Sequence, residues 1–307
     1  MLENDVSLMQ FSNFRSSSYK YRTLSENTVH NPIQCNKMNR ILLYVLLFTM
    51  TAAGDVSLTI EKKNSNTFVE IAKASSTNSD YTDKITSHTY QTMYGMFLVP
   101  LARNAKRIGQ KLKFLEIGLG CNMNYGPGKS VYVWRKLFGD TAEIWEGEYD
   151  AKCAKKLKES GELKGINLLV GDQGNSTTVN EWVATTGGKF NVIIDDGGHT
   201  NKQIKTSFDI LFPKALLPGG LYFIEDLQVS RYDLNGVPLM ADIIQSYIDQ
   251  LLIPTSYLTD KRFSEYTLQQ RKLYPIPKDI KWILCQHEAC VIAKCETASC
   301  GPNDFYK

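Results

Sequence analysis

The central part of the chain alternates apolar strand patterns with helical patterns, and this alternation constrains the fold more than any other feature. The strand patterns are KFLEIGLG, AEIWEGEYD, GINLLVGD, FNVIIDD and GGLYFIED, each nearly continuous in apolar residues before its polar end. Strands that are apolar on both sides are typical of a parallel sheet covered by helices on both faces. We therefore expect an α/β fold with a doubly wound, mostly parallel sheet. The helix in TYQTMYGMFLVPLARNAKRI is expected to be interrupted at Pro100.

After the fifth strand pattern the rhythm changes. A further helical pattern, PLMADIIQSYIDQLLI, is followed near the C-terminus by two short apolar runs, residues 282–285 and 289–292, separated by the polar residues QHE. Two apolar runs this close together predict a β-hairpin, so we expect the sheet to end in an antiparallel edge pair. The α/β domain is expected to span residues 81–307 and to follow a polar stem at residues 54–80.

The N-terminal region carries a targeting pattern. Residues 1–40 are polar, rich in Ser and Asn and without apolar periodicity, so we expect them to be disordered. Lys37 and Arg40 precede a short apolar run that ends in small residues, which predicts a signal peptide or signal anchor at residues 41–53. We expect Met38 to be the functional start, or the segment to be an uncleaved anchor with a membrane as its partner; a buried core helix is the alternative. Both targeting interpretations place the rest of the chain in the secretory pathway, lumenal or secreted.

Composition and cysteine content narrow the class of partner. The chain has 307 residues, of which 43% are hydrophobic and 22% charged, and its net charge of +3 does not favour nucleic acid. We expect a small molecule or glycan as the partner and no nucleic acid; oligomeric state is left open. Six cysteines follow the apolar run, an even number that allows disulfides in an oxidising compartment, with Cys295–Cys300 the expected pair.

The first strand pattern ends in a glycine turn. This turn places Gly118 and Gly120 where a ligand can approach the backbone; a bare structural turn is the alternative. The sixth position of the dinucleotide-binding fingerprint is Met123 instead of Gly or Ala, which disfavours a pyrophosphate. A nucleotide-like cofactor without a pyrophosphate is the better prediction.

Acidic residues end the next two strand patterns at the same edge of the predicted sheet. Glu146 and Glu148 compete for the position that binds ribose hydroxyls, with Glu148 nearer the end of its strand; solvated strand-end acids are the alternative. Asp172 follows the third strand, where its carboxylate could accept a hydrogen bond from an exocyclic amine. Ligands of such sheets bind outside the carboxyl ends of the strands, so we expect the cofactor here.

Four carboxylates end the fourth and fifth strand patterns. Asp195 and Asp196 end the fourth, and Glu225 and Asp226 the fifth. Sequential strands are usually neighbours, and carboxylates gathered beside His199 need a cation, so the sequence predicts a magnesium site. The ion would acidify a substrate hydroxyl and His199 would take its proton; an ordinary loop histidine is the alternative. Adjacent strand residues point to opposite faces, so Asp196 is expected to reach the ion, whereas Asp195, which could cap the next helix, has no defined role.

Together these motifs resemble a known family. LEIGLG, GEYD, VGDQ, IIDDGGH, FPKALLPGGLYFIEDLQ and the upstream YTDKITSHTYQTMY are similar to the macrocin O-methyltransferase type of class I S-adenosylmethionine-dependent methyltransferases, and to secreted eukaryotic relatives. The combination of DDGGH with PGGLYFIEDL is the specific part, because the glycine turn alone fits any class I methyltransferase. The resemblance covers most of the chain beyond the stem and makes residues 81–307 a methyltransferase domain with a Rossmann-like fold.

The resemblance implies S-adenosylmethionine and Mg²⁺ as cofactors and suggests residues for both. It implies Asp196, Glu225 and Asp226 as magnesium ligands and His199 as the general base. The S-adenosylmethionine pocket would be lined by Glu116, Gly118, Gly120, Glu148 and Asp172, and we place Asp195 with them. The family's acid after the second strand is typically aspartate, so Glu148 is a departure that leaves the register of the ribose contact open. Asp83, Lys84 and His88 match a segment that closes over cofactor or acceptor in the family.

The predicted function is magnesium-assisted O-methylation of a hydroxyl on a sugar or glycoside-like acceptor. A catalytically silent secreted binding protein with the same fold is one alternative. A nicotinamide-dependent oxidoreductase is another, which Met123 disfavours. The expected substrate wall, residues 227–280, carries no transferable motif and leaves the acceptor unnamed.

Overall fold

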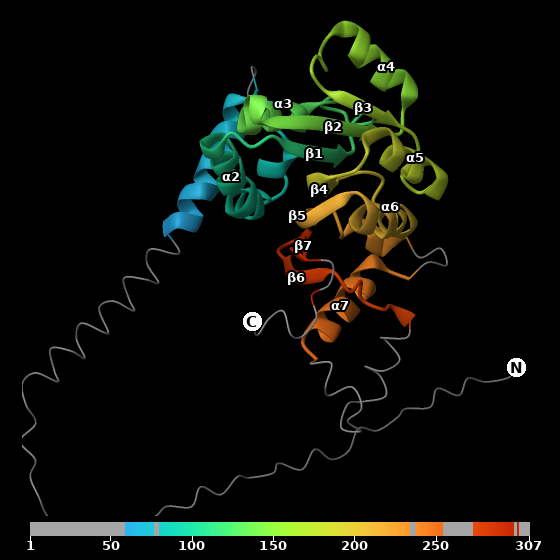
Figure 1. Cartoon of the computed structure of the whole chain (residues 1–307). Helices are drawn as coiled ribbons and strands as arrows, with labels where there is room; N and C mark the ends of the chain where they lie inside the picture. Colours follow the sequence, from blue (N-terminus) through green and yellow to red (C-terminus); the bar gives the residue numbers. More distant parts are fainter. Residues whose placement is uncertain (1–58, 77–79, 234–237, 254–272, 298–299, 301–307) are drawn as a thin grey trace, which may run out of the picture. The chain divides into compact units, whose positions relative to one another are not determined.

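The computed structural model describes residues 59–76, 80–233, 238–253, 273–297 and 300 (Figure 1). The predictions for residues 1–40 and 41–53 lie outside these ranges. Within them, no helix is long and apolar enough to cross a membrane.

A seven-stranded mixed sheet forms the centre of the domain, in the strand order β3-β2-β1-β4-β5-β7-β6. Its strands are β1 (Leu112–Ile117), β2 (Ala142–Glu148), β3 (Asn167–Val170), β4 (Phe190–Asp195), β5 (Leu216–Ile224), β6 (Ile280–Cys285) and β7 (Cys290–Lys294). The first five are parallel, whereas β7 pairs antiparallel with β5 and β6 antiparallel with β7. The predicted sheet, with its antiparallel C-terminal hairpin, is confirmed.

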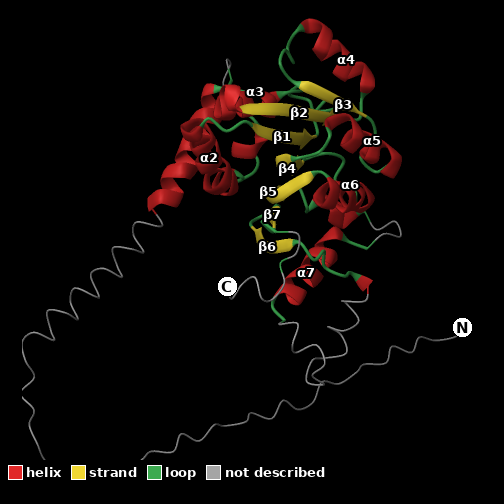
Figure 2. Ribbon diagram, viewed as in Figure 1, coloured by secondary structure: helices red, strands yellow, loops and turns green. Residues whose placement is uncertain are grey.

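Helices cover both faces of this sheet (Figures 1 and 2). The helices are α2 (Gln91–Ile108), α3 (Lys129–Phe138), α4 (Ala151–Ser160), α5 (Ser176–Thr186), α6 (Asn201–Lys214) and α7 (Met240–Leu251), with 3-10 turns η1 (Asp83–Ile85), η2 (Gly139–Thr141) and η3 (Val229–Tyr232). Polar side chains fix several starts. Asp150 caps α4, Asn175 caps α5, and Thr200 forms a capping box with Gln203 at α6. Each of these helices therefore begins directly at the edge where its preceding strand ends.

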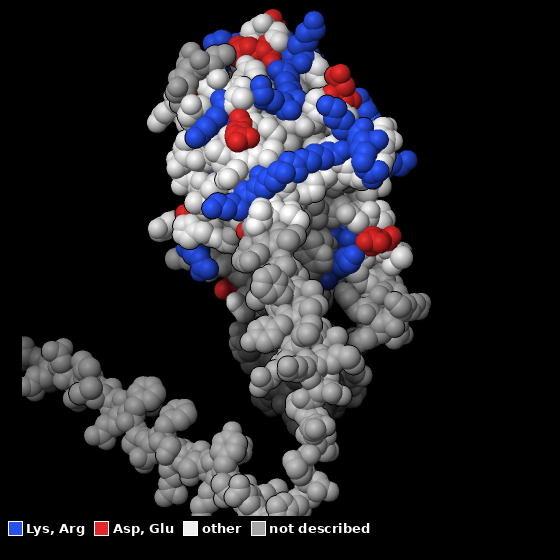
Figure 3. Space-filling view, turned by 90° about the vertical axis from the view of Figure 1, so that its left-hand side faces the viewer, with Lys and Arg blue, Asp and Glu red and all other residues white. Residues whose placement is uncertain are grey.

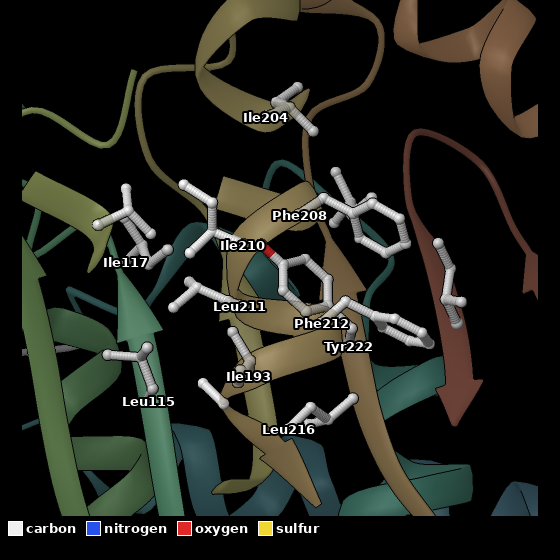
Figure 4. Close-up of a cluster of buried hydrophobic side chains, with 14 of the residues drawn as sticks. Leu115, Ile117, Ile193, Ile204, Phe208, Ile210, Leu211, Phe212, Leu216 and Tyr222 are labelled. Carbon is white, nitrogen blue, oxygen red and sulfur yellow. The ribbon is translucent and has the colours of Figure 1, made fainter. Parts of the chain in front are cut away.

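The period-two alternation of the strands divides the apolar residues between two cores. Leu115 and Ile193 belong to the core that α6 covers with Phe208 and Phe212 (Figure 4). Phe114 points to the opposite face and belongs to the second core, which also contains buried residues of α2 and α3. Burying each such side chain stabilises the fold by roughly 1.5–3 kcal/mol relative to leaving it exposed. The same alternation decides which acidic residues share a face below.

The predicted interruption of a helix at Pro100 is wrong. Helix α2 runs through Pro100 without a break. Pro100 is exposed, while Leu98, Val99 and Ala102 around it are buried. A proline inside a helix costs about 3 kcal/mol, and the burial of this apolar stripe offsets it.

The prediction of a polar stem at residues 54–80 also needs correction. Residues 59–74 are helical, and Phe68 and Ala72 are buried in the same core as α2 and α3. The Phe68 ring lies 5.3 Å from that of Tyr94 and 6.0 Å from that of Trp134. A single apolar stripe with a spacing of four residues is enough to dock a helix whose other faces are polar.

Basic side chains gather on one face of the domain. Figure 3 shows the side of the molecule that carries α2, where Lys and Arg side chains form a band and Asp and Glu side chains are few. This accords with the small positive net charge of +3.

Candidate active site

A cavity of about 940 Å³ opens at the carboxyl ends of the parallel strands. It lies where β1 and β4 are neighbours and the strand order reverses, the usual ligand position in sheets of this type. The glycine loop after β1, the end of β2 and the loop after β4 line it. Its size is that of a small-molecule site.

The glycine loop approaches the β4 loop too closely for a side chain. Gly118 has φ 111°, and a Cβ there would lie 1.9 Å from the carbonyl oxygen of Asp196. The Asp196 amide donates to the Ile117 carbonyl at 2.9 Å, which ties the two loops together. Gly118 and Gly120, both predicted for the cofactor pocket, line the cavity. Glycine is required at position 118 by this contact between loops.

The acidic residues predicted for the cofactor pocket take different positions. Glu148 lines the cavity, and its carboxylate accepts a hydrogen bond from the Asp150 amide at 2.7 Å. Asp172 is not a lining residue: it accepts from the Gly174 amide at 2.7 Å, and its neighbour Gln173 lines the cavity instead. Gln173 carries no charge or motif that would have distinguished it in the sequence.

Glu116 lies behind the cavity wall and is fully buried. Its carboxylate accepts hydrogen bonds from the Ser130 hydroxyl at 2.6 Å and the Trp134 indole at 2.7 Å. Glu146, its register partner on β2, is also fully buried. Burial, together with the neighbouring Glu116, raises the pKa of Glu146 well above its ordinary value. Of the two β2 acids that competed for the ribose position, only Glu148 reaches the cavity.

Asp195, also placed with the pocket residues, points to the opposite face of the sheet and does not line the cavity. Gln173 donates to its carboxylate at 2.8 Å and Tyr222 at 3.2 Å, and the Ser207 hydroxyl of α6 also donates to it. Burial raises its pKa, which these donors partly counter. Asp195 therefore anchors α6 to the sheet, and Thr200, not Asp195, caps that helix.

Three predicted residues meet at the cavity rim: Asp196, His199 and Asp226. The His199 Nε2 lies 4.0 Å from Asp196 Oδ1 and 3.6 Å from Asp226 Oδ2, and each side chain is about one-fifth exposed. Ligand atoms of all three lie within 4.8 Å of one another. His199 and Asp226 both have positive φ, 53° and 52°, a strain often found at functional sites.

Glu225, predicted as a magnesium ligand, does not line the cavity. It is 2% exposed, and Lys84 Nζ lies 2.9 Å from its Oε1 and 2.7 Å from its Oε2. The Tyr94 hydroxyl donates to Oε1 as well. Both carboxylate oxygens are therefore engaged inside the protein, while Asp226, one residue beyond, reaches the rim.

The segment that follows η1 fixes Asp226 from the other side. The Tyr90 hydroxyl donates to Asp226 Oδ1 at 2.6 Å, and His88 Nε2 lies 3.5 Å from the same oxygen. His88 Nδ1 is also 2.7 Å from Oε2 of Glu288 in the β6–β7 turn. Burial raises the pKa of Asp226, but the Tyr90 hydrogen bond and the nearby His199 and His88 outweigh it, so that the pKa is lowered.

Sequence reasoning missed Tyr90 and Glu288. The four-residue spacing of Tyr90 and Tyr94 at the start of a helix is a signal that both face the same way. Glu288 had no such signal, because only the pairing of β7 with β5 brings its turn to the rim.

Disulfides frame the cavity and the hairpin. Cys121, in the glycine loop, is bonded to Cys153 on α4, whose first residues Ala151 and Lys152 also line the cavity. Cys285 is bonded to Cys290. The predicted pair Cys295–Cys300 is confirmed.

No family model matches the chain. Curated proteins that are similar to part of it are all O-methyltransferases by name. Demethylmacrocin O-methyltransferase of Streptomyces fradiae is 36% identical over 157 residues, which are 47% of this chain and 37% of the relative. Mycinamicin VI 2''-O-methyltransferase of Micromonospora griseorubida is 34% identical over 120 residues, which are 38% of this chain and 28% of the relative. This chain is related to the macrocin-type O-methyltransferases.

The fold of these relatives is shown by a solved structure. The MycE methyltransferase from the mycinamycin biosynthetic pathway, solved with Mg, SAH and mycinamycin VI, superposes with a TM-score of 0.50 at 21% identity. The match covers 74% of this chain and 53% of that one. This chain therefore has the Rossmann-like methyltransferase fold. It matches only about a third of the length of the curated relatives.

Proposed function

We propose that this protein is a magnesium-assisted, S-adenosylmethionine-dependent O-methyltransferase that acts on a hydroxyl of a sugar or glycoside-like small molecule. The observation that carries the proposal is that one cavity is lined by two chemically different groups of residues, called here its first and second wall. A glycine loop and an acid lie at the ends of β1 and β2, and an Asp–His–Asp group lies at the ends of β4 and β5. The relatives named above are, by their names, O-methyltransferases of demethylmacrocin and of mycinamicin VI at its 2'' position.

The first wall suits S-adenosylmethionine. Gly118 and Gly120 leave the backbone of the β1 loop accessible, and Glu148 presents a carboxylate at the end of β2, where ribose hydroxyls are held in related folds. The bound cofactor supplies a methyl group that is already activated on a sulfonium. The protein therefore has to orient an acceptor oxygen in line with that methyl group and to remove its proton.

The second wall suits a hard divalent cation. Asp196 and Asp226 offer carboxylate oxygens, the ligands that Mg²⁺ prefers, and the lowered pKa of Asp226 keeps it ionised at neutral pH. Magnesium supplies positive charge that favours the ionised form of a neighbouring hydroxyl. Tyr90 and His88 hold Asp226 in place, which fixes the direction of its free Oδ2 toward His199.

His199 is proposed to accept the proton of the acceptor hydroxyl at Nε2. The ring lies between Asp196 and Asp226, which orient it and stabilise the imidazolium that forms. With the proton held at His199 Nε2, the acceptor oxygen would bond to the methyl carbon, and the sulfur would leave as a neutral thioether.

Calorimetric titration and methyl transfer from labelled cofactor test the proposal. Wild-type protein is expected to bind S-adenosylmethionine and to methylate glycosides only with Mg²⁺ present. His199→Ala should keep cofactor affinity and lose turnover by about 10²–10⁴-fold, the usual contribution of a general base. His287→Ala, at an exposed histidine of the hairpin, is the matched control. Absence of cofactor binding with and without Mg²⁺ refutes the proposal and favours a binding protein of the same fold.

We also propose that the chain enters the secretory pathway. Three disulfides among the described residues support an oxidising compartment. Asn175-Ser176-Thr177 is an exposed N-glycosylation acceptor sequence at the start of α5 and provides a test. Expression in eukaryotic cells should give a glycosidase-sensitive form that Asn175→Gln lacks; an unmodified, reduced chain in the cytosol contradicts the proposal.

A further inference from the structure

Lys84 is a buried cation at the centre of the strand-end acids. It lies in η1 and is 1% exposed. Its Nζ is 2.7 Å from Asp196 Oδ2, 2.7 Å from Glu225 Oε2 and 3.4 Å from Glu116 Oε1. Three strands of the sheet, β1, β4 and β5, thus each end in a carboxylate that meets one ammonium group.

The surroundings of Lys84 keep it charged. Three carboxylate groups lie within 3.4 Å of its Nζ, and each pairs with the ammonium form of the side chain.

Asp196 belongs to two groups at once. Its Oδ2 is bound to Lys84 on the inner side, whereas its Oδ1 is the oxygen 4.0 Å from His199 Nε2 at the cavity rim. Glu225 belongs only to the inner group, since Lys84 and Tyr94 take its oxygens. Asp226 belongs only to the rim, with Oδ2 directed to His199. One carboxylate thus bridges an inner and an outer cluster of acids.

The inner cluster has a carboxylate oxygen that is weakly engaged. Glu116 Oε1 is buried, accepts no shorter hydrogen bond and lies 3.4 Å from Lys84 Nζ. Carboxylate oxygens of Asp196, Glu225 and Glu116 around one buried cation have the ligand chemistry of a divalent-ion site.

We propose that the Lys84 ammonium group fills the inner half of a two-cation site, whose outer half, formed by Asp196 and Asp226 beside His199, is the open site for the divalent ion. This rests on the proposed function for the outer half only. Lys84 then acts as a positioning residue: it holds Asp196 Oδ2 so that Oδ1 faces the cavity, and it keeps Glu225 out of the outer set.

Removing the ammonium group should convert the inner half into a second divalent-ion site. Lys84→Ala leaves the carboxylates of Asp196, Glu225 and Glu116 around the space that the lysine side chain occupied. Uncompensated buried carboxylates need a cation, and oxygen ligands with space for water suit Mg²⁺ or Mn²⁺. Lys84→Met, which fills the space with an apolar chain, should not bind this additional ion.

The experiment counts bound Mn²⁺ by electron paramagnetic resonance on the full chain and measures thermal unfolding with and without Mn²⁺. Lys84→Ala is expected to bind one more Mn²⁺ per chain than wild type and to be stabilised more strongly by Mn²⁺. Lys294→Ala is the matched control, because Lys294 is also buried but contacts three backbone carbonyls and a single carboxylate, Asp279. It should bind no additional ion. Equal Mn²⁺ counts for Lys84→Ala and wild type overturn the proposal.

A second pair of variants decides the matter if Lys84→Ala does not fold even with Mn²⁺. Glu225→Gln keeps Lys84 in place and should bind Mn²⁺ as wild type does, whereas Asp226→Asn should lose it. Loss of Mn²⁺ in Glu225→Gln would place Glu225 in the outer set and overturn the proposal. Absence of Mn²⁺ binding in the wild-type protein would contradict the proposed function, which is a separate result. The additional ion in Lys84→Ala is counted relative to wild type, so the two failures are distinguishable.

Discussion

The carboxyl group of Glu146 gives a prediction that can be worked out in detail. Glu146 is fully buried, neither of its oxygens has a hydrogen-bond partner, and it lies opposite Glu116 on the neighbouring strand. Its pKa is raised well above the ordinary value, chiefly by burial. In the folded protein it should therefore be protonated, in a position from which it can share its proton with Glu116. Glu146→Gln imitates this protonated form, since an amide N–H can donate to the same acceptor.

The magnitude follows from the proton that unfolding releases. The pKa of Glu146 is higher in the folded state than in the unfolded state. At pH values above the unfolded-state pKa, the native state therefore binds more protons than the unfolded state, and the free energy of unfolding falls as pH rises. An unfolded glutamate has a pKa of about 4.3, and each pH unit above it costs about 1.4 kcal/mol while the native group stays protonated. At pH 7 the penalty is at most about 3.7 kcal/mol. Glutamine does not ionise and avoids it.

Urea unfolding of the oxidised protein at several pH values between 4 and 7 measures the effect. The difference in unfolding free energy between Glu146→Gln and wild type should be smallest near pH 4 and should grow in favour of the variant toward pH 7. A constant offset of about 1 kcal/mol, from the second amide N–H, does not affect this slope. Glu143→Gln, at a 45% exposed position on the same strand, should stay within about 0.5 kcal/mol of wild type throughout. A pH-independent difference for Glu146→Gln would refute the reasoning.

Three further predictions test the packing and the frame of the site. Phe68→Ala should lower the unfolding free energy by about 3–5 kcal/mol in urea unfolding, because the ring is fully buried; a change below about 1 kcal/mol would show that residues 59–74 are not part of the core. Asp195→Asn should cost about 1–3 kcal/mol of stability, because one of its donors loses its acceptor, while calorimetry shows unchanged cofactor affinity. A selective loss of cofactor affinity would contradict its structural role. Replacing Cys121 and Cys153 together by Ser should lower stability by about 3–4 kcal/mol for a loop of 32 residues. It should also weaken cofactor binding, because the glycine loop is no longer tied to α4; unchanged binding would exclude this second effect.

The positions of the acidic side chains show how much of the site the local sequence pattern predicts. Side-chain alternation along a strand predicts that Asp195 and Asp196 point to opposite faces of the sheet, and their hydrogen-bond partners confirm it. The same rule puts Glu225 on the face of Phe223 and opposite Ile224, but it does not apply to Asp226, which lies beyond the strand with φ 52°. Both residues were predicted as ligands, but Asp226 lines the cavity whereas Glu225 contacts Lys84.

The sequence by itself determined the strands, the parallel sheet with its terminal hairpin, and the chemistry gathered at the strand ends, because periodicity and strand-end residues are local properties of the chain. The tertiary structure decided which of those charges meet. Lys84 is 112 residues from Asp196 and 141 from Glu225, and only the docking of η1 over β1, β4 and β5 brings one ammonium group to their carboxylates. Electrostatic energy depends on distance in space and on burial, so the division of these acids into an inner and an outer set follows from the fold and cannot be deduced from the order of residues.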